Sequence, residues 1–597
     1  MRCVNIKHRI TSIERWGLRT RADFQADAVR SVRDAGFTGV LVNGGSGFGP
    51  DMLLPETLAD NEAIPQLMPL TRVANQREMQ RRCDLLDEAG LDTWLCLWGV
   101  PGVDLVEQDG SLKDRGNRFD HRTKLEMRAL FRTQPDLFGY RDTKLLSWRG
   151  VRPLCVSHPK VTEFYADLMA KLLERWPALR GILYFPGDHG AEICDDTCPR
   201  CRDTGLDPWQ RMIRYVNGLY GALHERRDDF KLYYTFWNMA YDNDLTVPQQ
   251  VMQGLSPGIG VCMSISDHIV ESRKGMNNVY TQPWVICPGV GAEFRAVCEI
   301  AKGQDRPVMV LGEIAQSEIW DPPCHNMPNP AKILGLLTNA RGCPGVDAVC
   351  DFWGHRGPYL SHANLAAMAA WFAEPDKEHA ELLRNAAIAH YGLAAEQEDL
   401  VEQALRAWSG FDAAVDEWTL IGWGQRFSPA IGRHAARGSM YRPLIPAELR
   451  RFANHGLRGL ERVGIQAGDF NRLLQEDRVR FIEAGDAFRE LATLLEELSP
   501  DGAKLAEREA DNIALAGELI GSQGRIFAAA SAYAGRETEL LRELVREEVD
   551  ARHRQLEVSA GIGVGEGIDP FMVGEDIQNM MLFVSSPDCN FSITPMP

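Results

Sequence analysis

The chain has little positive charge for its size. Its 597 residues include 83 acidic and 65 basic side chains, which give a formal net charge of -18. Binding to nucleic acid or to an anionic membrane requires a basic surface. The composition therefore argues against both kinds of partner.

Long apolar runs are also missing. The opening MRCVNIKHRITSIERWG has no secretory apolar stretch, and no segment approaches the length of a membrane span. The 14 cysteines are mostly scattered singly. Cys96, Cys262 and Cys350 fall in strand-like runs, where a buried free thiol is expected. This usage is typical of a reducing compartment and predicts a cytoplasmic protein.

Several well-known catalytic and nucleotide-binding motifs are absent. There is no pair of zinc-protease histidines. The glycine-rich NGGSGFG at 43–49 lacks both the G-x-G-x-x-G spacing and a Walker lysine. It predicts a tight loop that approaches a ligand rather than a nucleotide cradle.

What the chain does contain, up to about residue 375, is a regular alternation of strand-like and helix-like segments. The expected strands are Arg2–Ile6, Gly39–Val42, Thr93–Leu97, Gly181–Phe185, Leu232–Phe236, Ile259–Met263, Pro307–Leu311 and Asp347–Phe352. The expected helices include Ala22–Ala35, Gln76–Ala89, Val161–Trp176, Pro208–Arg226, Ala292–Ala301 and Pro330–Ala340. Such alternation implies a parallel sheet. Eight units predict an α/β fold, a (β/α)8 TIM barrel over residues 1–375, with a doubly wound open sheet as the alternative.

After about residue 375 the alternating pattern of strands and helices is replaced by a helical one. Residues 376–560 are predicted to form an α-helical bundle, because apolar residues recur every three or four positions. In one segment they are Phe481, Phe488, Leu491, Leu494, Leu495 and Leu498. Residues 561–597 are expected to form a C-terminal extension with a strand and a docking arm. The stretch 101–153, which carries Arg115, Arg118, His121 and Arg122, is long for a connection and is expected to shape a site.

Ionisable and aromatic residues follow the predicted strands. In a barrel, the carboxyl ends of all strands meet at one rim, where catalytic residues gather. The candidate catalytic carboxylates are Asp188, Glu192, Asp267 and Glu313. The candidate substrate-binding residues are Asn43, Trp98, His189, Trp237, Asn238, Trp284, Trp320, Trp353, His355 and Arg356.

These residue types suit the cleavage of glycosidic bonds. That reaction needs an acid to protonate the leaving oxygen and a second carboxylate that attacks or activates water. Tryptophan faces pack against the C–H faces of sugar rings. His355 and Arg356 form a cationic corner that suits the carboxylate of a uronic acid, or else a structural salt bridge.

The cysteines Cys194, Cys198 and Cys201 have the spacing C-x3-C-x2-C. Three thiolates need one more ligand for tetrahedral zinc, which Cys155, His158 or His189 could supply. Two hypotheses stand side by side, a structural zinc clip and a set of free thiols. The hydrolysis itself requires no cofactor.

The segment Ser157–Arg202 resembles the α-glucuronidase and β-hexosaminidase-like glycoside hydrolases and their uncharacterised bacterial relatives. It carries a Ser-His-Pro helix start, a Trp-Pro turn, the fourth strand, and then an acidic turn with C-P-x-C. The segment LLRNAAIAHYG at 382–392 resembles the helix that opens the C-terminal bundle of these enzymes. The resemblance implies that Glu192 or Asp188 is the general acid and that Asp267 and Glu313 oppose it. The adjacent Asp-Glu pair of hexosaminidases is not matched, because His-Gly-Ala separates Asp188 from Glu192.

The sequence thus predicts an exo-acting glycosidase whose substrate is a small carbohydrate. It is also compatible with assembly of the protein as a homodimer. Two alternatives stay open. One is a metal-dependent barrel lyase or isomerase with His189, Glu192, Asp267, His268 and Glu313 as ligands. The other is a non-catalytic carbohydrate-binding protein that keeps the aromatic rim.

Overall fold

The structure, a computed structural model, divides into two compact units. It describes residues 6–13, 24–43, 53–103, 121–140, 152–186, 193–236, 246–266, 269–273, 276–279, 289–312, 327–355, 362–419, 444–462, 464–562 and 570–585. The first unit comprises Met1–His268, Gly289–Glu313 and Leu337–Leu360. The second comprises Ile269–Pro288, Ile314–Leu336 and Ser361–Pro597.

The first unit contains a closed barrel of parallel strands in the order β1-β12-β11-β8-β7-β6-β3-β2. The strands are β1 (His8–Ile13), β2 (Gly39–Leu41), β3 (Asp92–Trp98), β6 (Leu179–Phe185), β7 (Lys231–Thr235), β8 (Gly260–Ser264), β11 (Val308–Gly312) and β12 (Val346–His355). Strand β1 closes the barrel by pairing with both β2 and β12. The predicted (β/α)8 barrel is confirmed, and the open doubly wound sheet is excluded.

The first barrel strand lies later in the sequence than predicted. Residues 2–5 of the expected strand Arg2–Ile6 lie outside the described ranges, and the described residue Ile6 precedes the first barrel strand, β1, which begins at His8. Thr11 in β1 is fully buried and donates its hydroxyl to Oδ2 of Asp351, its partner on β12, at 2.9 Å. A buried polar pair that is hydrogen-bonded replaces apolar packing at this position, so hydrophobicity alone misplaces the strand.

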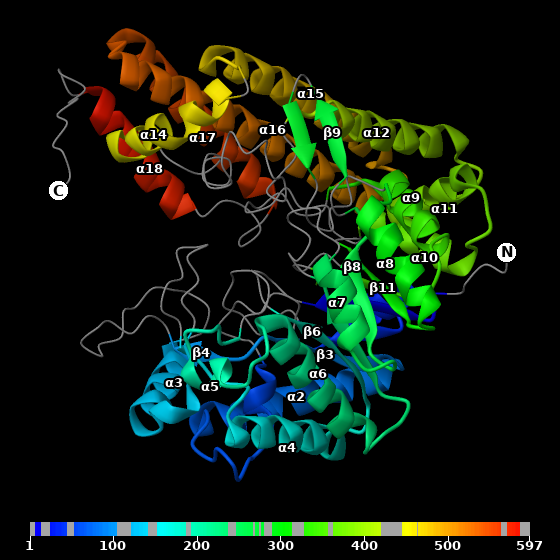
Figure 1. The fold of residues 1–597 in the computed structure, drawn as a ribbon. Helices are drawn as coiled ribbons and strands as arrows, with labels where there is room; N and C mark the ends of the chain where they lie inside the picture. The colour runs from blue at the N-terminus through cyan, green and yellow to red at the C-terminus, as the bar shows by residue number, and fades with distance from the viewer. Residues whose placement is uncertain are drawn as a thin grey trace. The chain divides into compact units, whose positions relative to one another are not determined.

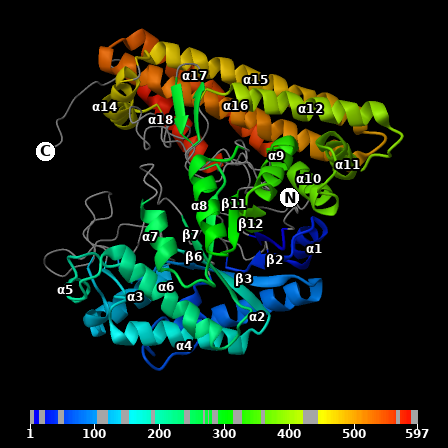
Figure 2. The same cartoon turned by 45° about the vertical axis from the view of Figure 1, so that its right-hand side comes forward.

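Helices connect the strands as the alternating pattern predicts. They are α1 (Ala26–Asp34), α2 (Pro69–Ala89), α4 (Pro159–Arg175), α6 (Pro208–His224), α7 (Thr246–Gly254), α8 (Ala292–Gly303) and α9 (Pro330–Arg341). Helix α2 begins at Pro69 rather than Gln76, because proline suits the first helical position, where no backbone donor is needed. Helices α4 and α6 lie side by side (Figures 1 and 2).

The barrel interior is packed around a tryptophan. Trp94 on β3 is fully buried, and a Cβ atom on Gly39 or Gly181 would lie 2.7 or 2.3 Å from its ring. These glycines stand on β2 and β6, the strands on either side of β3. The same interior contains Cys96, Cys262 and Cys350, whose predicted state as buried free thiols is confirmed.

The long connection after β3 has structure of its own. Strand β4 (Gly102–Val103) pairs antiparallel with β5 (Arg152–Pro153). Between them lie α3 (His121–Thr133) and the 3-10 turn η2 (Pro135–Leu137). Another 3-10 turn, η1 (Pro55–Thr57), precedes α2, and the short helix α5 (Pro199–Arg202) follows β6. Of the basic residues expected to shape a site here, Arg115 and Arg118 lie outside the described ranges.

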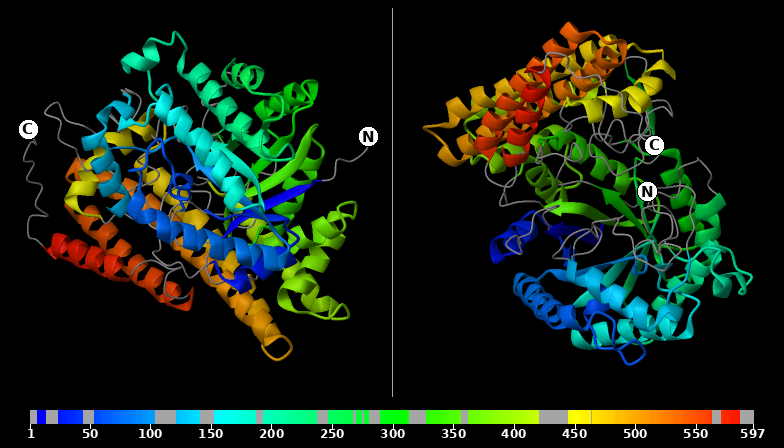
Figure 3. Two further views of the ribbon diagram at one scale, coloured as in Figure 1. Left: turned by 90° about the horizontal axis from the view of Figure 1, so that it is seen from below. Right: turned by 90° about the vertical axis from the view of Figure 1, so that its left-hand side faces the viewer.

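The second unit is helical, as predicted for the C-terminal region. Its helices are α10 (Ala363–Ala373), α11 (His379–Tyr391), α12 (Glu398–Glu417), α14 (Pro446–Arg462), α15 (Ala467–Leu495), α16 (Pro500–Gly535), α17 (Thr538–Ile562) and α18 (Pro570–Ser585). An antiparallel pair, β9 (Val270–Arg273) and β10 (Met276–Val279), also belongs to it. The helices coloured yellow to red run alongside one another in Figures 1 and 3.

Helix α15 only partly follows the apolar face predicted for it. Phe481, Phe488, Leu491 and Leu495 are fully buried, whereas Leu494 is 50% and Leu498 62% exposed. Leu494 is rotated by about 100° from Leu495 on a helix, and Leu498 lies beyond the last residue of α15. The two exposed leucines therefore do not belong to the packed face.

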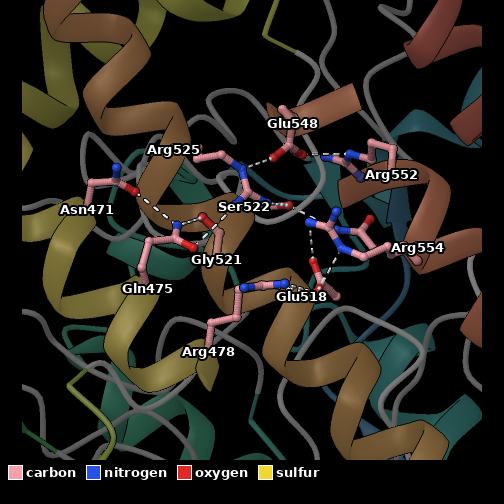
Figure 4. A network of polar contacts seen from close by, with 11 residues as sticks. Asn471, Gln475, Arg478, Glu518, Gly521, Ser522, Arg525, Glu548, Arg552 and Arg554 are labelled. Atoms are coloured by element: carbon pink, nitrogen blue, oxygen red, sulfur yellow. Dashed lines mark hydrogen bonds and ion pairs between the residues drawn. The ribbon is translucent and has the colours of Figure 1, made fainter. Parts of the chain in front are cut away.

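A buried polar network joins α15, α16 and α17 (Figure 4). The carboxylate of Glu548 accepts hydrogen bonds from Nε of Arg525 at 2.7 Å and from Nε of Arg552 at 2.8 Å. Glu518 likewise accepts from Arg478 and Arg554. Glu518 and Arg525 lie in the central part of α16, where nearly every residue is buried. The helix thus carries charged side chains in its buried part.

The expected strand in the C-terminal extension is not found in its described part. Residues 570–585 form helix α18, in which Val573, Met580 and Phe583 are buried on one face at helical spacing. Residues 563–569 and 586–597 lie outside the described ranges. Among the helices described, none combines the length and the hydropathy that a membrane crossing requires.

Candidate functional site

The strands of the barrel all point the same way, so their carboxyl ends share one rim. The rim is marked by the last strand residues Ile13, Leu41, Trp98, Phe185, Thr235, Ser264, Gly312 and His355. This is where (β/α)8 barrels carry their active sites. The rim is therefore the candidate site.

The predicted carboxylates all follow strands of this rim in the sequence. Asp188 and Glu192 come after β6, Asp267 after β8, and Glu313 directly after β11. These four residues lie outside the described part of the chain, and so do His189, Trp237, Asn238, Trp284, Trp320 and Arg356. For Trp353 and His355 the structure describes only the backbone, which belongs to β12, with His355 opposite Ile13 of β1.

Asn43 lies two residues after the end of β2 and is buried. Its side-chain Nδ2 donates to the carbonyl oxygen of Cys96 at 2.6 Å, and its Oδ1 accepts from the amide of Cys96 at 2.7 Å. The side chain thus imitates a strand backbone and prolongs the pairing of β2 with β3. Sequence reasoning placed Asn43 at the rim but did not foresee this use of its amide.

Trp98 ends β3 with its indole partly exposed. Its ring stacks on Phe185, the last residue of β6, with centroids 4.9 Å apart and planes 7° from parallel. The backbones of the two residues are also partners in the β3–β6 register. A partly exposed indole at the end of a barrel strand is the kind of side chain that packs against sugar rings.

Buried hydroxyl groups lie at the rim and next to it in the sequence, and the sequence analysis did not single them out. Ser12, Thr235, Ser264 and Ser266 are buried, and the hydroxyls of Ser264 and Ser266 lie 3.5 Å apart. Because side chains alternate along a strand, Thr235 and Ser264 share the inward face of Tyr233 and Cys262. That alternation, applied to each strand end, would have found them.

A second group of chemistry-bearing residues lies in the segments that follow β5 and β6. The sulfur atoms of Cys155, Cys194, Cys198 and Cys201 all lie within 4.8 Å of one another, and all four residues are buried. The Cys155 sulfur is 3.5 Å from that of Cys201 and 4.0 Å from that of Cys198. All four are free thiols.

The interactions among these thiols shift their pKa values in opposite directions. The pKa of Cys155 is lowered, chiefly by its hydrogen bond with Cys194, and that of Cys198 is lowered chiefly by Cys155. The pKa values of Cys194 and Cys201 are raised, chiefly by Cys155. Like charges this close disfavour one another, so the four thiols do not ionise together unless a cation joins them.

His158, one of the predicted alternatives for a fourth ligand, is engaged elsewhere. Its Nδ1 accepts from the amide of Lys160 at 3.1 Å, as the cap of α4, and its Nε2 lies 3.4 Å from Oδ2 of Asp136. Burial lowers the pKa of its ring. The structure thus brings Cys155, and not His158, to the three clustered cysteines.

The surroundings of the cysteine cluster are closely fitted. A Cβ atom on Gly139 would lie 2.0 Å from the sulfur of Cys194, so any larger residue there would have to displace the sulfur or the backbone. The buried guanidinium of Arg211 donates to the carbonyl oxygens of Cys194 and Cys201, at 3.3 and 3.4 Å, and pairs with Asp196 at 2.9 Å. These contacts fix the loop that carries three of the four thiols.

No protein-family model matches the chain, and no curated protein matches it. Among solved structures, a GH138 enzyme that targets pectin rhamnogalacturonan II is similar with a TM-score of 0.55 and 8% identity, over 98% of this chain and 84% of that chain. The Thermobaculum terrenum O-GlcNAc hydrolase has a TM-score of 0.44 and 11% identity, over 96% of this chain and 94% of that chain. The first likeness establishes a shared fold over nearly the whole chain.

Proposed function

We propose that this protein is a glycoside hydrolase whose active site is the rim of the barrel. The observation that carries the proposal is that carboxylates follow β6, β8 and β11 in a closed parallel barrel. Strands β6 and β11 are separated by β7 and β8 around the barrel. The ends of these two strands therefore lie apart around the barrel axis, which is the arrangement that an acid and its opposing carboxylate need.

In this proposal Glu192 or Asp188 is the general acid, and Glu313 or Asp267 is the base or nucleophile. Glu313 follows Gly312 and stands two positions after Leu311, whose side chain belongs to the barrel interior. The stacked Trp98 supports a sugar-binding rim. The fold shared with an enzyme that targets pectin rhamnogalacturonan II supports a carbohydrate substrate.

We further propose exo-action on small glycosides, with His355 and Arg356 as a subsite for a uronic-acid carboxylate. A guanidinium binds a carboxylate through two parallel hydrogen bonds. A reducing cytoplasm as the place of action stays a prediction from the cysteine pattern.

The test is a screen of aryl glycosides, including uronides, with and without a chelator. Replacing Glu192, Asp188, Glu313 and Asp267 singly by the matching amide should identify two whose loss lowers turnover by roughly 100- to 10,000-fold. Glu299→Gln, on the exposed face of α8, is the matched control and should leave turnover unchanged. The anomer first released, read by NMR, distinguishes a retaining from an inverting mechanism.

Three outcomes contradict the proposal. Full activity in all four amide variants removes these carboxylates from the mechanism. Activity that needs an added divalent ion, with no hydrolysis in its absence, indicates the metal-dependent lyase or isomerase. Tight glycan binding without turnover at any pH indicates a carbohydrate-binding protein.

A further inference from the structure

The four clustered thiols have the spacing of ligands around one metal ion. A tetrahedral site with metal–sulfur distances of about 2.3 Å places its sulfur atoms about 3.8 Å apart. The sulfur of Cys155 lies 3.5 and 4.0 Å from two of its neighbours, and no pair in the cluster exceeds 4.8 Å. The two sulfur atoms of a disulfide lie about 2.0 Å apart, so the thiols in this cluster are not joined by disulfide bonds.

We propose that Cys155, Cys194, Cys198 and Cys201 bind a single zinc ion with a structural role. Four thiolates complete the tetrahedral shell and leave no open position for water or substrate, which is the pattern of structural rather than catalytic zinc. Calcium and magnesium prefer oxygen ligands. The short distances between the sulfur atoms leave no room for a cluster of several iron ions.

The residues around the four thiols make the kinds of contact that support metal ligands in proteins. The hydroxyl of Ser157 lies 3.4 Å from the sulfur of Cys201, where it can donate to a metal-bound thiolate. Arg211 holds the segment that supplies Cys194, Cys198 and Cys201, and the amide of Gly139 donates to the carbonyl oxygen of Pro153, two residues before Cys155, at 2.8 Å. Such outer contacts orient ligands and strengthen metal binding.

The zinc ion would join two separate parts of the first unit. Cys155 follows β5, and its amide donates to the carbonyl oxygen of Leu137 at 2.8 Å, whereas the other three ligands follow β6. In the sequence, the segment from Gly187 to Glu192 lies between β6 and the first of these three cysteines. The ion would therefore fix the C-terminal end of the connection that contains Asp188 and Glu192. This structural role does not depend on which reaction those residues perform.

The experiment uses the full chain purified without a metal-affinity step. Elemental analysis should find one zinc ion per chain, and X-ray absorption at the zinc edge should find four sulfur neighbours at about 2.3 Å. Cys155→Ser and Cys198→Ser should each lower the zinc content at least tenfold. Cys83→Ala, which removes a buried thiol outside the cluster, should keep the zinc.

A measurement on the unaltered protein guards against variants that fail to fold. In the native protein, alkylation mapped by mass spectrometry should spare the four cysteines, and they should become reactive together when a strong chelator removes the zinc. Zinc-free protein with four alkylatable thiols would overturn the proposal. So would a Cys155–Cys201 disulfide, or iron in place of zinc. None of these readouts depends on glycosidase activity.

Discussion

The backbone of Gly139 lies directly against the sulfur of Cys194, so that a Cβ atom on the glycine would come within 2.0 Å of it. The glycine is also tethered on both sides. Its amide donates to the carbonyl oxygen of Pro153 at 2.8 Å, and its own carbonyl oxygen accepts from Nε of Arg152 at 2.5 Å. The close approach, rather than an unusual backbone angle, requires a glycine here.

Replacing Gly139 by alanine should therefore weaken both the packing and the metal site. The added methyl group must displace the Cys194 sulfur or the tethered backbone, and overpacking of this kind costs about 1–3 kcal/mol. We expect a lower melting temperature and faster release of zinc to a chelator. Gly221→Ala in helix α6, where a Cβ atom would meet nothing within 4 Å, is the control and should not lower the melting temperature. Unchanged stability in Gly139→Ala would show that the loop can move away.

A second glycine substitution, at Gly181 in the barrel core, should be destabilising because the added methyl group would meet the indole of Trp94. A Cβ atom on Gly181 would lie 2.3 Å from the ring, and Trp94 is fully buried. Gly181→Ala should destabilise the first unit by at least about 1–3 kcal/mol. Gly218→Ala, at an open position in α6, should instead be neutral or stabilise by up to about 1 kcal/mol. Chemical denaturation of both variants measures the difference.

The buried carboxyl group of Glu56 should make the stability of the fold depend on pH. Burial raises the pKa of Glu56 to about 7 from 4.5, and Oε1 of Glu56 accepts a hydrogen bond from the hydroxyl of Tyr165 at 2.9 Å. Between these pH values the folded state holds a proton that the unfolded state has lost, so the free energy of unfolding should fall as the pH rises from about 4.5 to 7. The loss is at most about 3.5 kcal/mol, since the shift spans about 2.5 pKa units of about 1.4 kcal/mol each.

Glu56→Gln should remove this dependence, because an amide oxygen still accepts from Tyr165 but carries no charge. We expect the variant to be more stable than the parent at pH 8 and similar to it at pH 4.5. Unfolding by denaturant at the two pH values tests this. Equal stability of the two proteins at pH 8 would mean that the Glu56 carboxylate is solvated in the folded state.

Most of the barrel could be predicted from the sequence, because each strand is a short apolar run bounded by polar residues. The exception was β1, where Thr11 is buried and paired with Asp351 from the far end of the barrel sequence. A contact between residues so distant in the chain leaves no local signal. Leu494 is a smaller exception: it has helical spacing but is 50% exposed, because it is rotated by about 100° from the buried Leu495.

The candidate site could be predicted less completely. Strand order and direction bring the rim residues to one end of the barrel, and the sequence is enough for that. Which partner a side chain chooses depends on tertiary contacts: the amide of Asn43 pairs with Cys96, and His158 caps α4 and lies near Asp136 instead of joining the cysteines. Cys155 was one of three alternatives for the fourth ligand; the fold brings it to the other three cysteines and engages His158 elsewhere, while His189 lies outside the described ranges.

The network around Glu548 is of a kind that sequence patterns hide, since charged residues on a long helix usually face water. Here the side chains of Glu548, Arg525 and Arg552 are each no more than 4% exposed, and the carboxylate binds both guanidinium groups (Figure 4). Removing the carboxylate would leave two buried positive charges without their shared partner. Breaking such a pair typically costs about 3–5 kcal/mol, much more than the pair's net contribution to stability.

Glu548→Ala should therefore unfold the helical unit at a clearly lower denaturant concentration, with a loss of about 3–5 kcal/mol. The matched control is Glu539→Ala on the same helix. Glu539 is 85% exposed and pairs with Arg542 at 2.7 Å, and an exposed pair contributes no more than about 1 kcal/mol. Circular dichroism during denaturation follows both variants. If the two lost the same small amount, water or rearranged neighbours would have to solvate Arg525 and Arg552, and the network would contribute little to holding α16 and α17 together.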